Sequence, residues 1–319
     1  MPESNEPELT GEGSARQPRN LDNATASLER RHEAREGDRV VGGLRSQRAR
    51  SWTERFLTRS TYGVLYALVV LACLFWGRIP TMVLVAAMSW LCCSEFYRIV
   101  RLSGRMPNEV IGLAAAVVYP TCALFRPEAE TAVTLLLMLV CGSWYVVTPR
   151  SNLSDAAVTV FGAVYTGLLY SSIVTIRAAA PGLEGALLAL GAMGSVWVND
   201  ATAYIVGSKL GRRKLAPRIS PNKSWEGMIG GLVGSCAVWA LVWWLGVLGV
   251  SLPLALLAGI LCGVTGVIGD LFESRLKRSV GVKDSGNLIP GHGGLLDRSD
   301  SMLFASMTAY FVLHLGGIL

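Results

Sequence analysis

The residues best suited to chemistry lie in a charged stretch, residues 269–301, that separates two strongly apolar segments. If the helix formed by the first apolar segment continues into this stretch, Asp270, Ser274 and Lys277 fall on one face. Residues at positions i, i+4 and i+7 line up along a helix. The sequence therefore predicts a helix end that presents a carboxylate, a hydroxyl and an ammonium group together.

A second set of polar residues opens the apolar segment on the other side of this stretch. Asp297, Asp300 and Ser301 share a helical face at i, i+3 and i+4. Between the two sets, residues 290–294 (Pro-Gly-His-Gly-Gly) form a turn that suits a glycine-rich backbone. This turn is expected to fold one helix end back onto the other. The paired carboxylates of Asp270 and Asp297 then suit Mg²⁺, which binds phosphates through one or two carboxylates.

A solvated cytoplasmic loop is the plainer interpretation of these charges. It accounts for the basic residues, but not for Asp270 and Asp297, since each lies at or inside an apolar span where a carboxylate is costly. His292 admits two interpretations, a general base and a structural hydrogen bond within the turn.

These residues also carry a resemblance to a known family. The stretch from Ser274 to Asp300 resembles the signature of the CDP-diacylglycerol synthase (phosphatidate cytidylyltransferase) family. The matching positions are Ser274, Leu276, Lys277, Arg278, Lys283, Asp284, Gly286, Ile289, Pro290, His292, Gly293, Gly294, Leu295, Asp297, Arg298 and Asp300. One position departs from the pattern. Ser299 stands where the family usually has an apolar residue or threonine.

An upstream stretch, residues 197–227, resembles the second motif of the same family and ends in the sequence SPNKSWEG, residues 220–227. Together the two motifs and the spans between them cover the chain from about residue 190 onward. The N-terminal half resembles the family only in its hydropathy, and the tail does not resemble it.

The resemblance implies transfer of CMP from CTP to phosphatidic acid, giving CDP-diacylglycerol and pyrophosphate. It also implies a two-cation centre, Mg²⁺ with K⁺, at Asp270 and Asp297 with Ser274 nearby, and a homodimer. We expect catalytic roles for Asp270, Ser274, Lys277, Asp297 and Arg298. The expected substrate-binding residues are Ser220, Lys223, Arg278, Lys283, His292 and Asp300, together with Asp200, for which a structural hydrogen bond is the alternative. Nucleic acid is not expected as a partner.

Two other functions remain open at this stage. A CTP-dependent isoprenoid-lipid kinase would share the nucleotide but would transfer the γ-phosphate, and the signature of residues 274–300 argues against it. A transporter would also carry acidic residues within glycine-broken helices. The sequence contains no inverted repeat of the kind that many transporters have, and its charge is concentrated toward the C-terminal half.

The elements that must position these residues are membrane helices. The chain is 51% hydrophobic and 16% charged, whereas soluble domains carry about 25% charged residues. Its apolar residues form blocks long enough to cross a bilayer of about 30 Å as helix. We predict an all-α polytopic membrane protein with about nine spans. The expected spans are 61–77, 79–95, 109–125, 131–148, 155–176, 184–207, 228–248, 251–269 and 301–318, and the first two form either a hairpin or one bent element.

Three regions follow from this pattern. Residues 1–60 are rich in arginine and acidic residues and predict a disordered cytoplasmic tail. Residues 61–180 are expected to form N-terminal transmembrane helices, and residues 181–319 the catalytic transmembrane region.

The loops carry charges that predict an orientation. With the N-terminus in the cytoplasm, fifteen Lys or Arg residues fall on cytoplasmic loops and three on the opposite side. That asymmetry follows the positive-inside rule. We therefore expect a multi-pass protein of the inner membrane, with the catalytic loops cytoplasmic and the C-terminus outside.

Overall fold

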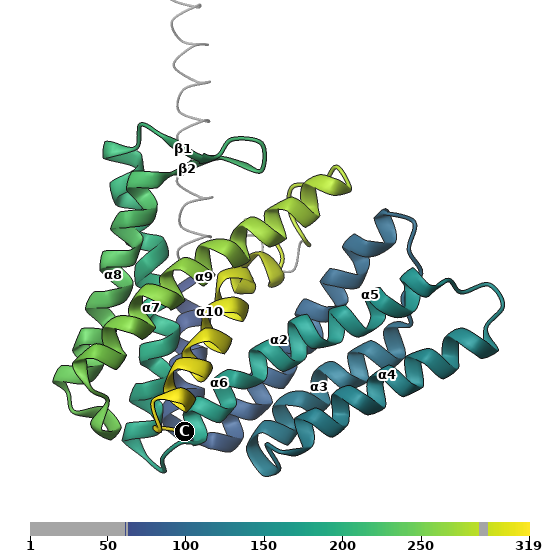
Figure 1. Ribbon diagram of the computed structural model, residues 1–319, viewed down its shortest axis with the longest axis horizontal. Coiled ribbons are helices and arrows are strands. Elements are labelled where there is room, and N and C mark those ends of the chain that lie inside the picture. The colour runs from purple at the N-terminus through teal and green to yellow at the C-terminus, as the bar shows by residue number, and fades with distance from the viewer. Residues whose placement is uncertain (1–60, 62, 287–292) are drawn as a thin grey trace, which may run out of the picture. The chain divides into compact units, whose positions relative to one another are not determined.

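The computed structural model describes residue 61, residues 63–286 and residues 293–319 (Figure 1). The predicted N-terminal tail lies outside the described residues. Over the described ranges the chain is almost entirely helical, and a helix overlaps each of the nine expected spans. The prediction of an all-α membrane protein is confirmed.

The N-terminal helices run as far as residue 178. They are the helix Gly63–Trp76, α2 (Arg78–Leu102), α3 (Glu109–Phe125), α4 (Ala129–Val147) and a long helix made of α5 (Leu153–Ala163), the π-helical turn η1 (Val164–Leu168) and α6 (Leu169–Ala178).

The C-terminal helices follow from residue 183. They are α7 (Leu183–Leu210), α8 (Trp225–Trp244), α9 (Leu252–Ser279) and α10 (Leu296–Leu315). The short strands β1 (Lys214–Ala216) and β2 (Ser220–Ser224) lie between α7 and α8, and the 3₁₀ turn η2 (Val247–Gly249) lies between α8 and α9.

Five helices in the described part of the chain are long and apolar enough to cross a membrane: α2, α4, α5–α6, α8 and α9. Helices α7 and α10 are long but more polar. Asn199 and Asp200 lie within α7, and Asp297 and Asp300 within the first turns of α10. Part of the candidate chemistry therefore lies on two helices that are more polar than the other spans, and the rest lies on the C-terminal turns of the apolar helix α9.

The first two expected spans are separate helices, broken at Gly77. Its backbone is extended rather than helical. The Thr81 hydroxyl donates to the carbonyl oxygens of both Cys73 and Gly77. Residues eight apart would lie about 12 Å apart along a continuous helix, so the Thr81–Cys73 bond marks a sharp change of direction.

Glycines set the close packing of the C-terminal helices. A side chain at Gly259 of α9 would lie 2.6 Å from the backbone of Cys236 on α8. Farther along α9, a side chain at Gly263 would lie 2.6 Å from Leu232, and one at Gly269 would overlap the backbone of Asp300 on α10. Small residues let membrane helices approach closely, and here they bring α9 against both neighbours.

The two sets of helices meet along α10, which packs against α2 and α6 as well as α9. An aromatic cluster fills this junction. Tyr165 of the π-helical turn contacts Phe96 of α2, Phe272 of α9 and Phe304 of α10. Tyr165 is 1% exposed. The junction is therefore a packed core between the N-terminal and C-terminal helices.

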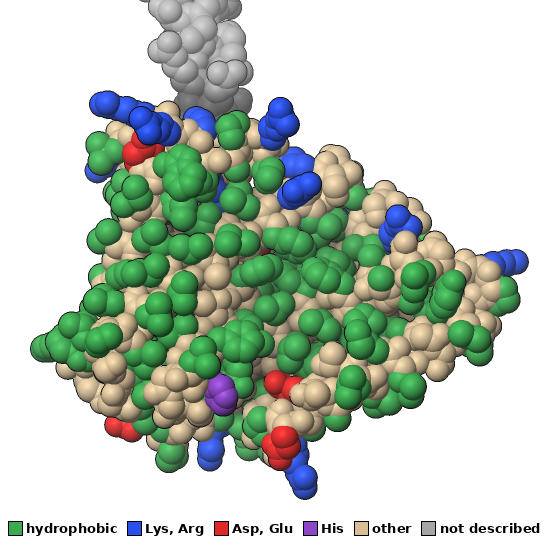
Figure 2. All heavy atoms as spheres, in the orientation of Figure 1, with side chains coloured by type: hydrophobic (Ala, Val, Ile, Leu, Met, Phe, Trp, Pro, Cys, Tyr) green, Lys and Arg blue, Asp and Glu red, His purple; other side chains and the backbone are tan. Residues whose placement is uncertain are grey.

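The strands β1 and β2 form an antiparallel hairpin that the sequence analysis did not predict. It is too short and polar to show an apolar alternation. Figure 2 shows hydrophobic side chains over most of the visible face, with Lys and Arg along the edge that includes this hairpin. Helix α4 contributes much of the exposed apolar surface, including Leu135, Leu139 and Val146. Such a surface is expected where a helix faces lipid.

Candidate active site

The centre of the site is a buried ion pair between α9 and α10. The Lys277 ammonium donates to Asp297 Oδ1 at 2.5 Å and also contacts the Glu273 carboxylate one turn earlier on α9. Glu273 is 0% exposed and Lys277 is 9% exposed. The prediction that the two carboxylate-bearing helix ends meet is confirmed. One lysine therefore faces two carboxylates in a region sheltered from water.

The second oxygen of Asp297 organises the turn that precedes α10. Asp297 Oδ2 accepts the backbone N–H groups of Ser285 at 2.9 Å and Gly294 at 2.8 Å. Gly293 has φ of +83°, the left-handed region that glycine enters without strain. His292 lies outside the described residues, so its two interpretations stay predictions.

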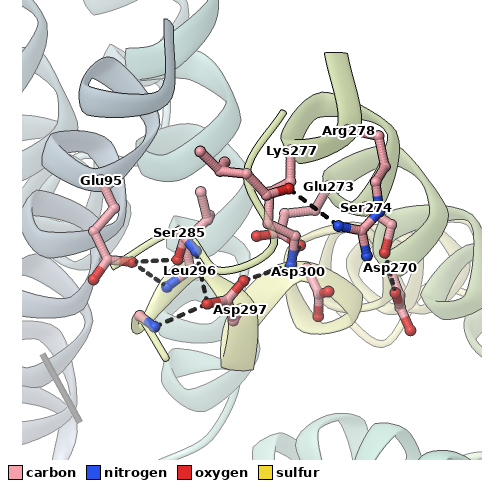
Figure 3. Close-up of polar contacts among 12 residues, drawn as sticks. Glu95, Asp270, Glu273, Ser274, Lys277, Arg278, Ser285, Leu296, Asp297 and Asp300 are labelled. Carbon is pink, nitrogen blue, oxygen red and sulfur yellow. Dashed lines mark hydrogen bonds and ion pairs between the residues drawn. The ribbon is translucent and has the colours of Figure 1, made fainter. Parts of the chain in front are cut away.

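A second ion pair joins the two sequence motifs. Lys223 of β2 contacts Asp270 Oδ2 of α9 at 2.6 Å, and Ser274 donates its hydroxyl to Asp270 Oδ1 at 3.1 Å (Figure 3 shows Asp270 and Ser274). Asp270 and Lys223 are partly exposed, with 31% and 24% of their side-chain surfaces accessible. The shared face predicted for Asp270, Ser274 and Lys277 is confirmed, since α9 continues to Ser279.

The hairpin motif positions Lys223 through backbone contacts. Ser224 caps α8 by accepting the N–H of Gly227 at 3.1 Å. Glu226 accepts the N–H groups of Arg212 and Arg213, which tie the hairpin to the start of α8. Much of the SPNKSWEG motif therefore builds a support that holds Lys223 over Asp270.

Two further carboxylates lie beside the Lys223–Asp270 pair. Asp270 interacts electrostatically with both Asp200 of α7 and Asp300 of α10, and Asp200 also with Lys223 and Arg298. Asp300 is 8% exposed, whereas Asp200 is exposed. Like charges brought together are unfavourable until a cation or a proton neutralises some of them. Hard carboxylate oxygens of this kind fit Mg²⁺.

The geometry favours Asp270 over Asp297 as a metal ligand. Among the described residues, no three His, Cys, Asp or Glu side chains converge closely enough to share one ion. Asp297 already accepts three hydrogen bonds, from Lys277, Ser285 and Gly294. Each oxygen of Asp270 also has a partner, Ser274 or Lys223, but its side chain is partly exposed beside two further carboxylates, so an ion carrying phosphates and water could reach it.

The other predicted residues lie around this centre with different degrees of exposure. Arg278, Lys283 and Arg298 are exposed, and Arg278 donates to the carbonyl oxygen of Val282. Ser220 begins β2 opposite Ala216 and is half-buried. Lys277, for which a catalytic role is expected, differs from these residues because it is buried and its ammonium contacts two carboxylates.

Sequence reasoning missed two acidic residues. Glu273 lies beneath Lys277, and Glu95 of α2 reaches the turn before α10 from the N-terminal helices (Figure 3). Glu95 interrupts an otherwise apolar helical segment, which is the signal that could have identified it. Glu273 stands within the charged stretch, and its only local signal is the spacing of four residues to Lys277. The sequence alone does not show that Glu95 meets residues about two hundred positions later.

The departure at Ser299 also has a structural partner. Ser299 is 0% exposed, and its hydroxyl accepts a hydrogen bond from Tyr170 of α6 at 2.9 Å. The polar atom is therefore satisfied where the family usually has an apolar residue or threonine.

Comparisons with known proteins agree with these motifs. The sequence profile of the Cytidylyltransferase family matches residues 57–316. A phosphatidate cytidylyltransferase of Bacillus subtilis is 33% identical over 270 residues, which cover 82% of this chain and 97% of the relative. Another, from Synechocystis, is 34% identical over 264 residues, covering 72% and 87%. A third, from Mycobacterium bovis, is 39% identical over 178 residues, covering 53% and 54%. The chain belongs to the cytidylyltransferase family.

Proposed function

We propose that this protein transfers CMP from CTP to phosphatidic acid, forming CDP-diacylglycerol and releasing pyrophosphate. The Lys223–Asp270 pair is the observation that carries the proposal, because it joins the two motifs into one site. A phosphate oxygen of phosphatidic acid attacks the α-phosphorus of CTP. The bond from that phosphorus to the bridging oxygen of the β-phosphate breaks, and pyrophosphate leaves with the bonding electron pair.

Positioning and charge neutralisation supply most of the rate in such phosphoryl transfers. The chain offers exposed cations on both sides of the turn, Arg278 and Lys283 before it and Arg298 after it. Cations on both sides of the turn suit two phosphate-bearing substrates held together. Lys277 acts differently, as the counter-ion that holds Asp297 of α10 against α9.

We further propose that the site uses Mg²⁺, with Asp270 as its main protein ligand and K⁺ as a second cation. When bound, the ions would neutralise the triphosphate and the charge that develops on the leaving pyrophosphate. Ser274, which donates to Asp270, orients that carboxylate. Asp297 supports the site from α10, and Asp200 and Asp300 add negative charge that favours cation binding.

The function is tested by giving the purified protein CTP that is labelled either in the cytosine ring or in the γ-phosphate. Label in the cytosine ring is expected to enter the chloroform-soluble product only when phosphatidic acid and Mg²⁺ are both present. Pyrophosphate should appear in equal amount. Lipid labelled from the γ-phosphate but not from the ring would overturn the proposal and favour a lipid kinase that releases CDP.

We also propose that the protein lies in the cytoplasmic membrane with both motif-bearing loops on the cytoplasmic side. The distribution of Lys and Arg supports this orientation. A reporter that is active only in the cytoplasm should be silent when fused after Leu319. A strong signal there would contradict the proposed orientation of α10. The homodimer implied by the family resemblance stays a prediction, which the mass of the protein in detergent would test.

A further inference from the structure

The start of α10 lacks a cap of its own. Its N-cap residue is Leu295, whose apolar side chain cannot accept a hydrogen bond from the backbone N–H groups of the first turn. The first N–H groups of a helix have no partner within it and need an external acceptor when they are buried. Leu295 and Leu296 are 5% and 0% exposed. Their backbone N–H groups therefore need an acceptor from elsewhere in the chain.

Glu95 of α2 supplies that acceptor from the N-terminal helices. Its Oε1 accepts the N–H of Leu295 at 3.0 Å, and its Oε2 accepts the N–H of Leu296 at 2.8 Å. Oε2 also accepts the hydroxyl of Ser285 at 2.9 Å. Glu95 is 8% exposed. A carboxylate at the N-terminus of a helix also interacts favourably with the helix dipole.

Two glycines allow the carboxylate to come this close. A side chain at Gly286 would lie 2.7 Å from Glu95 Oε1, and one at Gly294 would overlap both Glu95 Oε2 and the Ser285 hydroxyl. The glycines on either side of the turn therefore make room for Glu95.

Glu95 and Asp297 both bind residues that flank the turn, as Figure 3 shows for Ser285. Ser285 is shared between them, since its hydroxyl donates to Glu95 and its backbone N–H to Asp297. Asp297 in turn contacts Lys277 of α9. Ser285 thus links Glu95 to Asp297, the carboxylate that pairs α10 with α9.

We propose that Glu95 is a positioning residue for the transfer reaction. Its carboxylate fixes the start of α10 so that Asp297 and Asp300 face α9. The N-terminal helices thereby influence, through Glu95, the geometry of a site whose other residues lie in the C-terminal helices. Glu95 acts through α10 and does not contact the reacting atoms. The expected effect on kcat rests on the proposed function, whereas the hydrogen bonds from Leu295 and Leu296 to Glu95 can be measured separately.

The first variant is Glu95→Gln, which keeps the size of the side chain but replaces one acceptor oxygen with an amide nitrogen that donates. We expect kcat to fall on the order of 10- to 100-fold, the range seen when a small displacement misplaces reacting groups. KM for CTP and for phosphatidic acid should change little, because the substrate contacts remain. Glu109→Gln is the matched control, since Glu109 makes a partly exposed ion pair with Arg101 on the neighbouring helix.

A second variant and a second measurement separate positioning from stability. Ser285→Ala removes one of the three hydrogen bonds to Glu95, so it should lower kcat less. The double variant should lose little beyond Glu95→Gln alone, because both changes remove the same contact. Hydrogen exchange should be faster at the amides of Leu295 and Leu296 in Glu95→Gln, whether or not the wild-type protein makes CDP-diacylglycerol.

The outcomes distinguish the two proposals. Faster exchange at these amides in Glu95→Gln, together with a wild type that forms no lipid product, would overturn the proposed function but support the capping role. Wild-type kcat in Glu95→Gln would overturn the positioning role. So would a loss of activity that, in both single variants, only matched the loss of folded protein.

Discussion

The N-terminal helices and the C-terminal helices use different means to pack and carry different chemistry. All five lysines of the chain follow residue 208, and α9 meets its neighbours through glycines. The N-terminal helices pack through larger side chains such as Tyr97 and Tyr119, both 0% exposed. Their contribution to the described site is chiefly Glu95. Glycines that meet the backbone of a neighbouring helix are most frequent where carboxylates of different helices are brought together. In the N-terminal helices such an approach occurs at Gly167, whereas Gly112 and Gly162 make room for the Tyr97 ring.

The largest expected effect comes from removing the lysine that pairs the two C-terminal helix ends. Lys277→Met leaves the buried carboxylates of Glu273 and Asp297 without their counter-ion, and breaking a buried pair in this way costs about 3–5 kcal/mol. We expect a large drop in the melting temperature of the protein in detergent. Adding Glu273→Gln should recover part of it. Arg278→Met is the control for stability, because Arg278 is exposed. Equal melting of Lys277→Met and wild type would contradict the role of the ion pair.

Removing the partly exposed carboxylate should affect turnover more than folding. Asp270→Asn keeps the size of the side chain but loses the charge that would hold Mg²⁺. We expect turnover to fall on the order of 10²–10³-fold, as when an enzyme loses one electrostatic contact to the transition state. Initial rates at limiting and saturating Mg²⁺ measure it, with Glu184→Gln at the exposed start of α7 as control. Unchanged rates at limiting Mg²⁺ would remove Asp270 from the site.

A matched pair of glycine substitutions tests the packing difference directly. In Gly259→Ala the new methyl group meets the backbone of Cys236, whereas in Gly142→Ala on α4 nothing lies within 4 Å. Overpacking of this kind costs about 1–3 kcal/mol, so Gly259→Ala should lower the melting temperature. Gly142→Ala should raise it slightly, because alanine is favoured over glycine in helices by about 0.5–1 kcal/mol. Similar shifts in both variants would show that the two regions do not differ in this respect.

The smallest effect is expected at the contact between the two regions through Ser299. Ser299→Ala removes the acceptor of the Tyr170 hydroxyl, and a typical hydrogen bond contributes about 0.5–1.5 kcal/mol. Tyr170 also interacts with Tyr66, so its hydroxyl keeps a second partner. A double-mutant cycle with Tyr170→Phe measures the coupling between the two side chains. Strictly additive effects would mean that this hydrogen bond contributes nothing to stability.

The sequence predicted the helices and part of the geometry around the candidate site, because both leave strong local signals. Apolar blocks marked the spans, and the spacing of Asp270, Ser274 and Lys277 predicted their common face. The hairpin β1–β2 was missed, since its stability comes from Glu226 and the cap of α8 rather than from an apolar alternation. Glu95 and Glu273 were missed for a different reason. Their partners depend on which helices pack together, and that is decided by distant contacts rather than by neighbouring residues.

The reach of Glu95 across the sequence has a consequence for how the protein is made. Its partners Leu295 and Leu296 lie 200 and 201 positions later, so α2 is synthesised long before the start of α10 exists. Domains are generally completed from the N-terminus during synthesis. Glu95 lies in the last third of α2, near Arg98 and Arg101, and in the proposed orientation this end of α2 faces the cytoplasm. Its carboxylate can then stay hydrated until α10 is inserted. Assembly of the site is therefore one of the final steps in the synthesis and insertion of the chain.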